Sequence, residues 1–190
     1  MELLKQRIRE AGIARTEEIL DVSTFFNAQV DATLMQAIGQ DFADYFANHE
    51  FDAFVTVESS GIAPSVFASL AAQKPLVIIK KSQKVLDDPR YIQQESFSFT
   101  KGNAYHLTTH LDFIQGKRII LIDDFLAQGS VVTNVETLLN KADATLVATG
   151  ICISKDYQPG FKKLSAAGKD VYCQVHVTGL NPETNAIHIK

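Results

Sequence analysis

The sequence predicts a single α/β domain whose mostly parallel sheet is flanked by helices. A chain of 190 residues suits one large domain, since domains are most often about 100 to 150 residues long. Hydrophobic residues make up 46% of the chain and charged residues 21%, close to the globular average, which excludes a disordered chain. Short apolar segments alternate with segments of helical spacing, and this alternation favours a parallel sheet with helices on both faces.

Two helices are expected before the first strand. Leu4, Ile8 and Ala11 recur at helical spacing, and Gly12 is expected to end this first helix. Asp31 suits the start of a second, longer helix, whose apolar side chains recur at steps of three and four residues and form one broad face. These side chains belong to Leu34, Met35, Ile38, Phe42, Tyr45 and Phe46.

Four apolar segments rich in Val, Ile, Leu and Phe predict the strands of the sheet. They lack strict alternation, which is typical of strands covered on both faces. Helical segments separate some of them. The expected strands are residues 51–57, 76–79, 118–122 and 145–153, and the expected helices are residues 63–72 and 132–141.

One region departs from this rhythm. Alternating apolar and polar residues on either side of a turn predict a β-hairpin that forms a flap beside the sheet. Its apolar positions are Phe97, Phe99, Tyr105 and Leu107, and its turn is at residues 101–103.

The segment before the hairpin, residues 80–94, is predicted to be a mobile loop. It contains Pro89 and two adjacent acids and shows no helical period. Cations outnumber acids around it, and they either steer a polyphosphate into a site or form an ordinary solvated surface. The cations are Lys74, Lys80, Lys81, Lys84 and Arg90, and the acids are Asp87 and Asp88.

Charge and hydropathy exclude several classes of protein. The net charge of −4 provides no overall positive field, so we expect no nucleic-acid partner. No apolar segment approaches the ~18 residues that cross a bilayer, and the charged start lacks the features of a signal peptide. We therefore expect a cytoplasmic protein without a membrane partner.

Cys152 and Cys173 lie in apolar segments and are expected to be small buried hydrophobes, with no role in a disulfide or metal site.

The most informative motif follows the third predicted strand. In an open parallel sheet, ligands bind beyond the carboxyl ends of the strands. Here the strand leads into Asp123 and Asp124, and Gly129 then precedes a helix. The amides at such a helix start suit a phosphate, and adjacent carboxylates suit sugar hydroxyls or the water ligands of Mg²⁺. The alternative is that the acids only cap the helix or accept hydrogen bonds from the loop.

Two other strand ends carry weaker motifs. Small polar residues and Gly61 follow the first strand, and this backbone can approach a pyrophosphate closely, although an ordinary helix cap explains it too. Lys155 and Tyr157 follow the fourth strand and set a cation beside an aromatic ring. The alternative is that Lys155 is an ordinary solvated surface residue. Neither a Gly-x-x-x-x-Gly-Lys-Ser/Thr loop nor a Gly-x-Gly-x-x-Gly turn occurs.

The segment Ile-Leu-Ile-Asp-Asp-Phe-Leu-Ala-Gln-Gly, residues 120–129, resembles the 5-phosphoribosyl 1-pyrophosphate (PRPP) signature of the type I phosphoribosyltransferases. The similarity continues in residues 20–27, 57–64, 98–101 and 153–160, and the segments near the two ends are similar to the xanthine branch of the family. The resemblance implies the type I phosphoribosyltransferase fold in one domain over residues 1–190. It also implies a base-binding hood, made by residues 1–35 with the C-terminal tail.

The same resemblance implies roles for individual residues. Asp123 and Asp124 are the expected catalytic residues, facing the ribose hydroxyls. Leu20, Asn27, Lys155 and Tyr157 are expected to bind the purine. Ala127, Gln128, Gly129, Ser130 and Val131 are expected to bind the 5-phosphate of PRPP, and Glu58, Ser59, Ser60, Gly61 and Lys81 the pyrophosphate.

The implied activity is the transfer of the phosphoribosyl group from PRPP to xanthine in purine salvage, by a homodimer. Mg²⁺ is expected to be bound through PRPP oxygens and water, without a direct protein ligand. Ala127 stands where hypoxanthine-guanine enzymes carry an Asp, and the loop Ala-Gln-Gly-Ser-Val departs from the Ala-Asn-Gly-Gln-Ala of close relatives. Two alternatives remain: a PRPP-binding regulatory protein of the same fold, and a broader 6-oxopurine phosphoribosyltransferase that accepts guanine and hypoxanthine.

Overall fold

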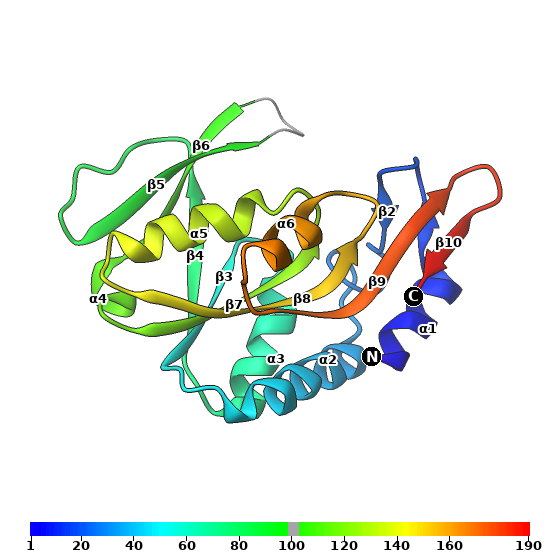
Figure 1. Cartoon of the computed structure of the whole chain (residues 1–190), viewed down its shortest axis with the longest axis horizontal. Helices are drawn as coiled ribbons and strands as arrows, with labels where there is room; N and C mark the ends of the chain where they lie inside the picture. The colour runs from blue at the N-terminus through cyan, green and yellow to red at the C-terminus, as the bar shows by residue number, and fades with distance from the viewer. Residues whose placement is uncertain (99–102) are drawn as a thin grey trace.

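The computed structural model describes residues 1–98 and 103–190 and is built around one eight-stranded sheet. The pairs from β4 through β3, β7 and β8 to β9 are parallel, and the pairs at both edges are antiparallel, which confirms the predicted mostly parallel α/β fold (Figure 1). In spatial order the strands are β10 (Ala186–Ile189), β9 (Val171–Asn181), β8 (Thr145–Lys155), β7 (Arg118–Leu126), β3 (Ala53–Val57), β4 (Leu76–Ser82), β6 (Asn103–His110) and β5 (Tyr91–Ser98).

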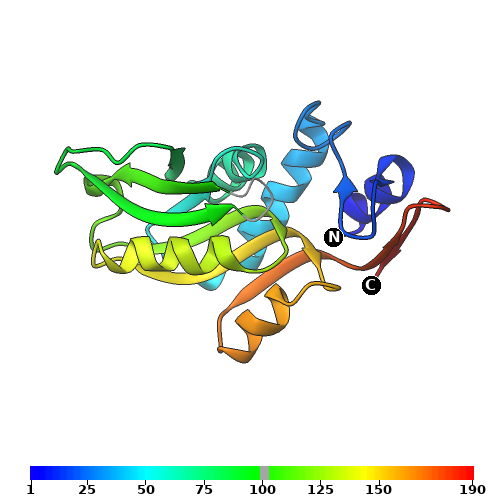
Figure 2. The same ribbon diagram turned by 90° about the horizontal axis from the view of Figure 1, so that it is seen from above.

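Helices cover both faces of the central strands (Figure 2). Helices α2 (Ala32–Tyr45) and α3 (Ile62–Ala72) pack on one face, in a cluster that includes Phe54. Helices α5 (Ser130–Asn140) and α6 (Gly160–Ala166) pack on the other face, in a cluster that includes Val55. All five residues of β3 are buried, because alternate side chains enter these two clusters.

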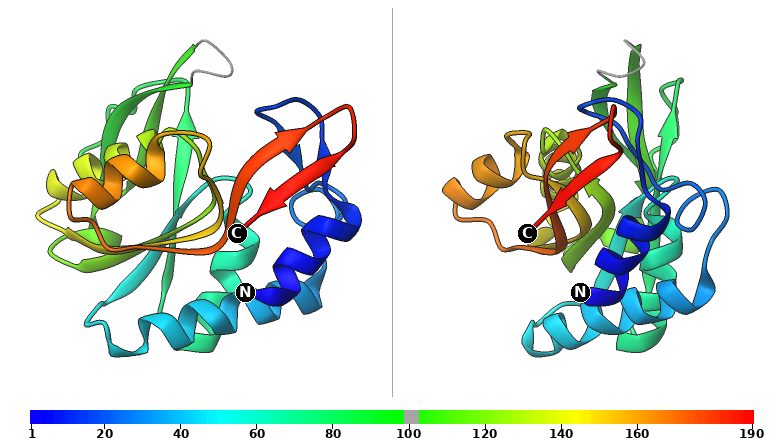
Figure 3. Two further views of the ribbon diagram at one scale, coloured as in Figure 1. Left: turned by 45° about the vertical axis from the view of Figure 1, so that its right-hand side comes forward. Right: turned by 90° about the vertical axis from the view of Figure 1, so that its right-hand side faces the viewer.

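The N-terminal segment packs beside the C-terminal strands. Helix α1 (Glu2–Ala11) buries Leu4 and Ile8 as its spacing predicts, and Figure 3 shows it beside β10. A two-stranded sheet follows, formed by β1 (Ile13–Ala14) and β2 (Leu20–Asp21). The Asp31 carboxylate accepts a hydrogen bond from the Leu34 N–H and so caps α2 as predicted. A 3₁₀ turn, η1 (Phe46–Asn48), ends this part of the chain.

The prediction of a mobile loop over residues 80–94 is wrong at both of its ends. Residues 80–82 belong to β4 and residues 91–94 to β5, and both pair with β6, so that only residues 83–90 lie between strands. The antiparallel hairpin of β5 and β6 is confirmed, while Phe99 and most of the predicted turn lie outside the described residues. The strands escaped prediction because their backbone partner, β6, follows later in the chain.

Two further expectations need correction. The strand β4 is not covered on both faces, since the Ile78 side chain is 37% exposed at the edge of α3. The five cations do not form one cluster either. The Lys74 ammonium donates to the Phe51 carbonyl at the amino end of β4, and Arg90 pairs with Asp88. Only three of the lysines therefore lie near the carboxyl end of β4.

Several elements had no clear sequence signal, among them α6, β10 and the short helix α4 (Leu111–Ile114). The strand β7 also runs past its predicted end, because Phe125 and Leu126 still pair with β8. Cys152 and Cys173 are buried free thiols, as expected. In the described part of the chain, no helix has both the length and the apolar character to span a membrane.

Candidate functional site

A polar cavity of about 250 Å³ lies at the carboxyl ends of β3, β4 and β7. Parallel strands bring their carboxyl ends to one edge of the sheet, which is why residues far apart in the sequence meet here. The cavity joins seven predicted site residues, from the Asp pair, the segment after β3, β4 and the start of α5. Its lining consists of Val57, Glu58, Ser59, Ser60, Lys81, Asp123, Asp124, Phe125 and Val131.

The two carboxylates of the Asp pair lie in different environments. The Asp123 side chain is buried, with 7% exposed, whereas Asp124 is half-buried. Burial raises the pKa of Asp123 well above its usual value, and the neighbouring Asp124 carboxylate adds to the rise. The Asp123 Oδ1 accepts the Asp124 backbone N–H at 3.0 Å, which fixes the orientation of the buried group. Neither carboxylate caps α5, but Asp123 does accept a local backbone N–H, so only the helix-cap half of the alternative is wrong.

The segment after β3 folds tightly against the Asp pair. A Cβ atom on Gly61 would lie 2.4 Å from the Thr56 Oγ1 and 3.2 Å from the Asp123 Oδ1, so that only glycine fits. The Glu58 carboxylate accepts the Lys81 backbone N–H at 2.6 Å and ties this segment to β4. Gly61 is the N-cap residue of α3, without a side-chain hydrogen bond, so the segment does begin the helix as the helix-cap interpretation expects.

The start of α5 forms a second hollow next to the first, of about 70 Å³. Gly129 takes a positive φ of 85° there, which turns the chain from β7 into the helix. A helix start leaves N–H groups without partners inside the helix and favours negative charge. The hollow is lined by Asp123, Phe125, Leu126, Ala127, Gln128, Gly129, Ser130, Val131 and Val132, which include the whole predicted phosphate loop.

Lys155 and Tyr157 meet on one acceptor in the N-terminal segment. The Lys155 Nζ and the Tyr157 hydroxyl donate to the Glu18 backbone carbonyl, at 2.9 and 3.1 Å. The Lys155 Nζ also lies 5.0 Å from the centre of the Phe125 ring, a cation–π distance. Burial lowers the pKa of Lys155 and raises the pKa of Tyr157 to about 12. The two side chains are thus partly withdrawn from water, contrary to the solvated-lysine alternative.

The other two predicted purine-binding residues differ from each other. Leu20 is buried in the same apolar cluster against which Phe125 and Tyr157 pack. Asn27 is exposed on the segment between β2 and α2, and no hydrogen bond in the described part of the chain joins its side chain to the cleft. The structure therefore places Leu20 in the cluster that also contacts Phe125 and Tyr157, while the role of Asn27 stays a prediction.

Sequence reasoning missed three residues of this site. Phe125 lines both hollows, and its ring makes the cation–π contact with Lys155. Its position directly after the Asp pair was a signal that the sequence offered. Gly160 donates its N–H to the Ala127 carbonyl, and a Cβ there would lie 2.4 Å from that oxygen. Glu18 contributes through its backbone carbonyl, which every residue possesses, so its side chain gave no signal.

The oxygen atoms of the Asp pair suit a hard cation such as Mg²⁺. In residues 1–98 and 103–190, no group of three or more His, Cys, Asp or Glu side chains is arranged to hold a metal ion. The Glu58 carboxylate is already engaged with the β4 backbone. The residues present thus fit a magnesium ion that takes most of its ligands from a bound phosphate compound and water.

Comparison with known proteins shows the family and supports the fold. The model of the phosphoribosyl transferase domain family matches residues 26–186. A xanthine phosphoribosyltransferase of Clostridium botulinum (strain Eklund 17B) is 41% identical over 100% of both chains, and one of Agathobacter rectalis is 43% identical over 90% of both. Among solved structures, adenine phosphoribosyltransferase from Trypanosoma brucei superposes with a TM-score of 0.74 at 16% identity, covering 91% of this chain and 79% of its own. The enzyme from Rhodothermus marinus gives 0.73 at 16%, covering 93% and 100%.

Proposed function

The chain belongs to the phosphoribosyl transferase domain family, and from that premise we propose that it transfers the 5-phosphoribosyl group of PRPP to xanthine. A purine nitrogen forms a bond to C1 of the ribose, the bond from C1 to pyrophosphate breaks, and the purine loses a proton. The products are xanthosine monophosphate and pyrophosphate, in purine salvage. The observation that carries the proposal is that one cleft unites a helix start suited to a phosphate with a carboxylate pair suited to the adjoining ribose.

The phosphate and ribose of PRPP are assigned to adjoining hollows. The amides of residues 127–131 bind the 5-phosphate, supported by the dipole of α5. Asp123 and Asp124 accept hydrogen bonds from the ribose hydroxyls and favour the positive charge that develops on the sugar as its bond to pyrophosphate breaks. Phosphate binding by backbone amides does not depend on residue type. The assignment is therefore compatible with the departure of residues 127–131 from the loop of close relatives.

The pyrophosphate is assigned to the opposite wall of the cavity. Backbone groups of residues 58–61 can approach it closely, and Lys81 supplies a positive charge beside the Asp pair. When bound to PRPP, a magnesium ion would neutralise negative charge on the leaving pyrophosphate. Glu58 holds this wall against β4 through the Lys81 N–H and thereby keeps the lysine near the leaving group.

The base is assigned to the side of the cleft where Lys155, Tyr157 and Leu20 meet, under a hood made by residues 1–35 with the C-terminal tail. An ammonium group donates hydrogen bonds only, so Lys155 favours the exocyclic oxygen of a 6-oxopurine over the amine of adenine. Ala127 offers no carboxylate to remove a proton. A base that enters partly ionised, as the more acidic xanthine does, therefore suits this site.

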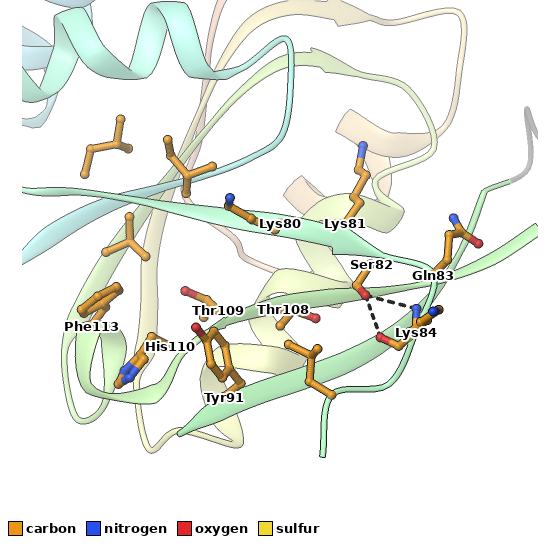
Figure 4. A pocket seen from close by; sticks show the side chains of 14 residues that line it. Lys80, Lys81, Ser82, Gln83, Lys84, Tyr91, Thr108, Thr109, His110 and Phe113 are labelled. Atoms are coloured by element: carbon orange, nitrogen blue, oxygen red, sulfur yellow. Dashed lines mark hydrogen bonds between the residues drawn. The ribbon is translucent and has the colours of Figure 1, made fainter. Parts of the chain in front are cut away.

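We also propose that the chain works as a homodimer, through an apolar groove on the outer side of β4, β5 and β6. The groove has a volume of about 910 Å³. Figure 4 shows Tyr91, His110 and Phe113 gathered on one side of β4, while Lys81 points away from them. Large exposed apolar surfaces mark contact sites, and a second copy offers the same surface in return. The apolar side chains of the groove belong to Leu76, Ile78, Leu86, Tyr91 and Phe113.

Two alternatives remain for the same site. A broader 6-oxopurine phosphoribosyltransferase would use the same contacts, since Lys155 reads an oxygen that guanine and hypoxanthine share with xanthine. A PRPP-binding regulator would bind PRPP without turning it over.

PRPP carries several negative charges and does not cross a bilayer readily, so we assign the reaction to the cytoplasm.

The test supplies PRPP and Mg²⁺ with xanthine, guanine, hypoxanthine or adenine in turn and follows nucleotide formation. We expect the largest kcat/KM with xanthine and the smallest with adenine. Comparable values for the three 6-oxopurines would favour the broader enzyme. Calorimetric binding of PRPP without formation of any nucleotide would favour the regulator, and no binding of PRPP would overturn all three.

A further inference from the structure

A hydrogen-bonded cluster behind the cleft anchors the turn that carries Lys155 and Tyr157. The Ser154 hydroxyl donates to the Asp156 carboxylate at 2.6 Å, and the His176 Nδ1 lies 3.0 Å from both oxygens of the same carboxylate. A carboxylate only accepts hydrogen bonds, so the Nδ1 of His176 carries the proton in this contact. The Phe161 ring packs edge-on against the imidazole at 5.0 Å.

The cluster lies on the side of the turn away from the cleft. Asp156 is the first residue of the turn after β8, and its N–H donates to the Val177 carbonyl of β9. Its carboxylate contacts His176 of β9, while its two neighbours, Lys155 and Tyr157, both donate to the Glu18 carbonyl. The cluster can influence the base only through those neighbours.

The backbone does not need this cluster for its own hydrogen bonds. Strand pairing already places Ser154 beside His176, and the turn closes through the Gln158 N–H and the Lys155 carbonyl. The side-chain cluster adds a partly buried carboxylate, and burying a carboxylate costs free energy unless donors surround it. Its two donors offset that cost and leave the carboxylate one orientation.

We propose that Asp156, held by Ser154 and His176, is a positioning residue that sets Lys155 and Tyr157 in place for the purine. Lysine is a flexible side chain, and a base contact is stronger when the donor is already in position. The anchor removes freedom from the backbone on either side of Asp156 before the base arrives. This inference rests on the proposed function, because it concerns the base that the same site takes.

The test replaces the anchor and measures each substrate separately. For Asp156→Ala and His176→Ala we expect the KM for xanthine to rise about tenfold, as the loss of a charge-assisted hydrogen bond implies. The dissociation constant for PRPP should stay within about twofold, because the amides at the start of α5 are held without Asp156. Asp156→Asn keeps an acceptor for Ser154 and His176 and should restore most of the affinity for xanthine.

The matched control is Asp170→Ala, which removes another His–Asp contact on the same sheet. The His49 Nε2 lies 2.8 Å from the Asp170 carboxylate. Asp170 directly precedes β9 and lies at the opposite end of that strand from the cleft. We expect Asp170→Ala to leave both substrate constants unchanged, whatever it does to the melting temperature.

The outcomes distinguish the positioning role of Asp156 from the proposed transferase function. An unchanged KM for xanthine in Asp156→Ala and His176→Ala would overturn the positioning role alone, as would equal losses for xanthine and PRPP or a failure of Asp156→Asn to recover. If the unaltered chain forms no xanthosine monophosphate, both the proposed function and this inference are overturned.

Discussion

Asp123 places a carboxyl group almost out of contact with water, directly beside a second carboxylate. Burial and the neighbouring charge both oppose its ionisation, which is why its pKa is raised. Such an arrangement costs folding free energy, and proteins retain it where the charge serves a bound ligand. The proposed role of Asp123 at the ribose accounts for this cost in stability.

We predict that Asp123→Asn stabilises the fold at pH 7 and lowers the turnover of the enzyme. Because the folded pKa lies above the unfolded one, the native state loses stability as the pH rises from the unfolded value towards the folded one. An amide avoids this loss, which is about 1.4 kcal/mol for each unit of pKa shift. Urea unfolding at pH 7 and pH 3 checks the prediction, and an equal gain at both would contradict it.

The matched control is Asp52→Asn, for which the sign is reversed. The hydrogen bonds from Arg118 lower the pKa of Asp52 to about 2, so its contribution to stability is present above the unfolded pKa and is lost as the pH falls through the folded one. We expect this variant to be less stable at pH 7 and to approach the unaltered chain at low pH.

Lys155 is the residue at which base selectivity should be most visible. We predict that Lys155→Ala lowers kcat/KM for xanthine by at least tenfold and for adenine by much less, because only the oxygen of xanthine accepts from the ammonium. Lys162→Ala, which removes an exposed cation on α6, is the control and should leave the ratio unchanged. Equal losses with all four bases would remove Lys155 from base recognition.

At the scale of elements, the phosphate loop depends on the turn that precedes α6. The Gly160 N–H donates to the Ala127 carbonyl, and the space between these backbones leaves no room for a side chain. The loop after β7 and the turn after β8 are thus one unit, formed because β7 and β8 are neighbours in the sheet. A change of the Gly160 backbone should therefore be felt by the loop after β7, whereas a side-chain change at Asp156 leaves this backbone contact in place.

We predict that Gly160→Ala weakens PRPP binding at least tenfold, since its Cβ would lie 2.4 Å from the Ala127 carbonyl and 2.8 Å from the Gly129 nitrogen, and one backbone must move. Calorimetry with PRPP and Mg²⁺ measures the effect. The control is Gly179→Ala in β9, whose Cβ would meet its nearest neighbour at 3.6 Å and should bind PRPP normally. Unchanged affinity in Gly160→Ala would show that the loop does not depend on this contact.

At the scale of the whole molecule, the apolar groove on β4, β5 and β6 faces away from the cleft but shares β4 with it. Lys81 faces the Asp pair, and the neighbouring Lys80 and Ile78 face the groove side. A second copy seated in the groove would therefore also support the strand that supplies Lys81. Dimer formation and catalysis are expected to be linked through β4.

We predict that Phe113→Asp converts a dimer into a monomer, because it places a charge in the apolar contact, and that it lowers turnover. Sedimentation velocity measures the oligomeric state. The control is Val30→Asp, at a similarly exposed apolar residue (44%, against 54% for Phe113) outside the groove. A chain that sediments as a monomer without any substitution would contradict the proposed dimer.

The parts of the fold that could be predicted are those whose signal is local. The buried apolar segments of β3 and β7, the spacing of Leu4 and Ile8, and the Asp31 cap each depend on a few neighbouring residues. Residues 80–82 and 91–94 were misassigned because their hydrogen bonds go to β6, and charged or polar side chains at a sheet edge give no strand signal.

The same distinction holds for the site. The sequence by itself determined which chemical groups follow the strands, namely two carboxylates, a glycine turn and a lysine beside a tyrosine. Only the tertiary structure decided that Lys155 and Tyr157 share the Glu18 carbonyl and that Asp156 binds His176, since these partners lie 137, 139 and 20 residues apart. Backbone carbonyls and long-range side-chain pairs depend on how the sheet orders its strands, and that order is a property of the packed chain as a whole.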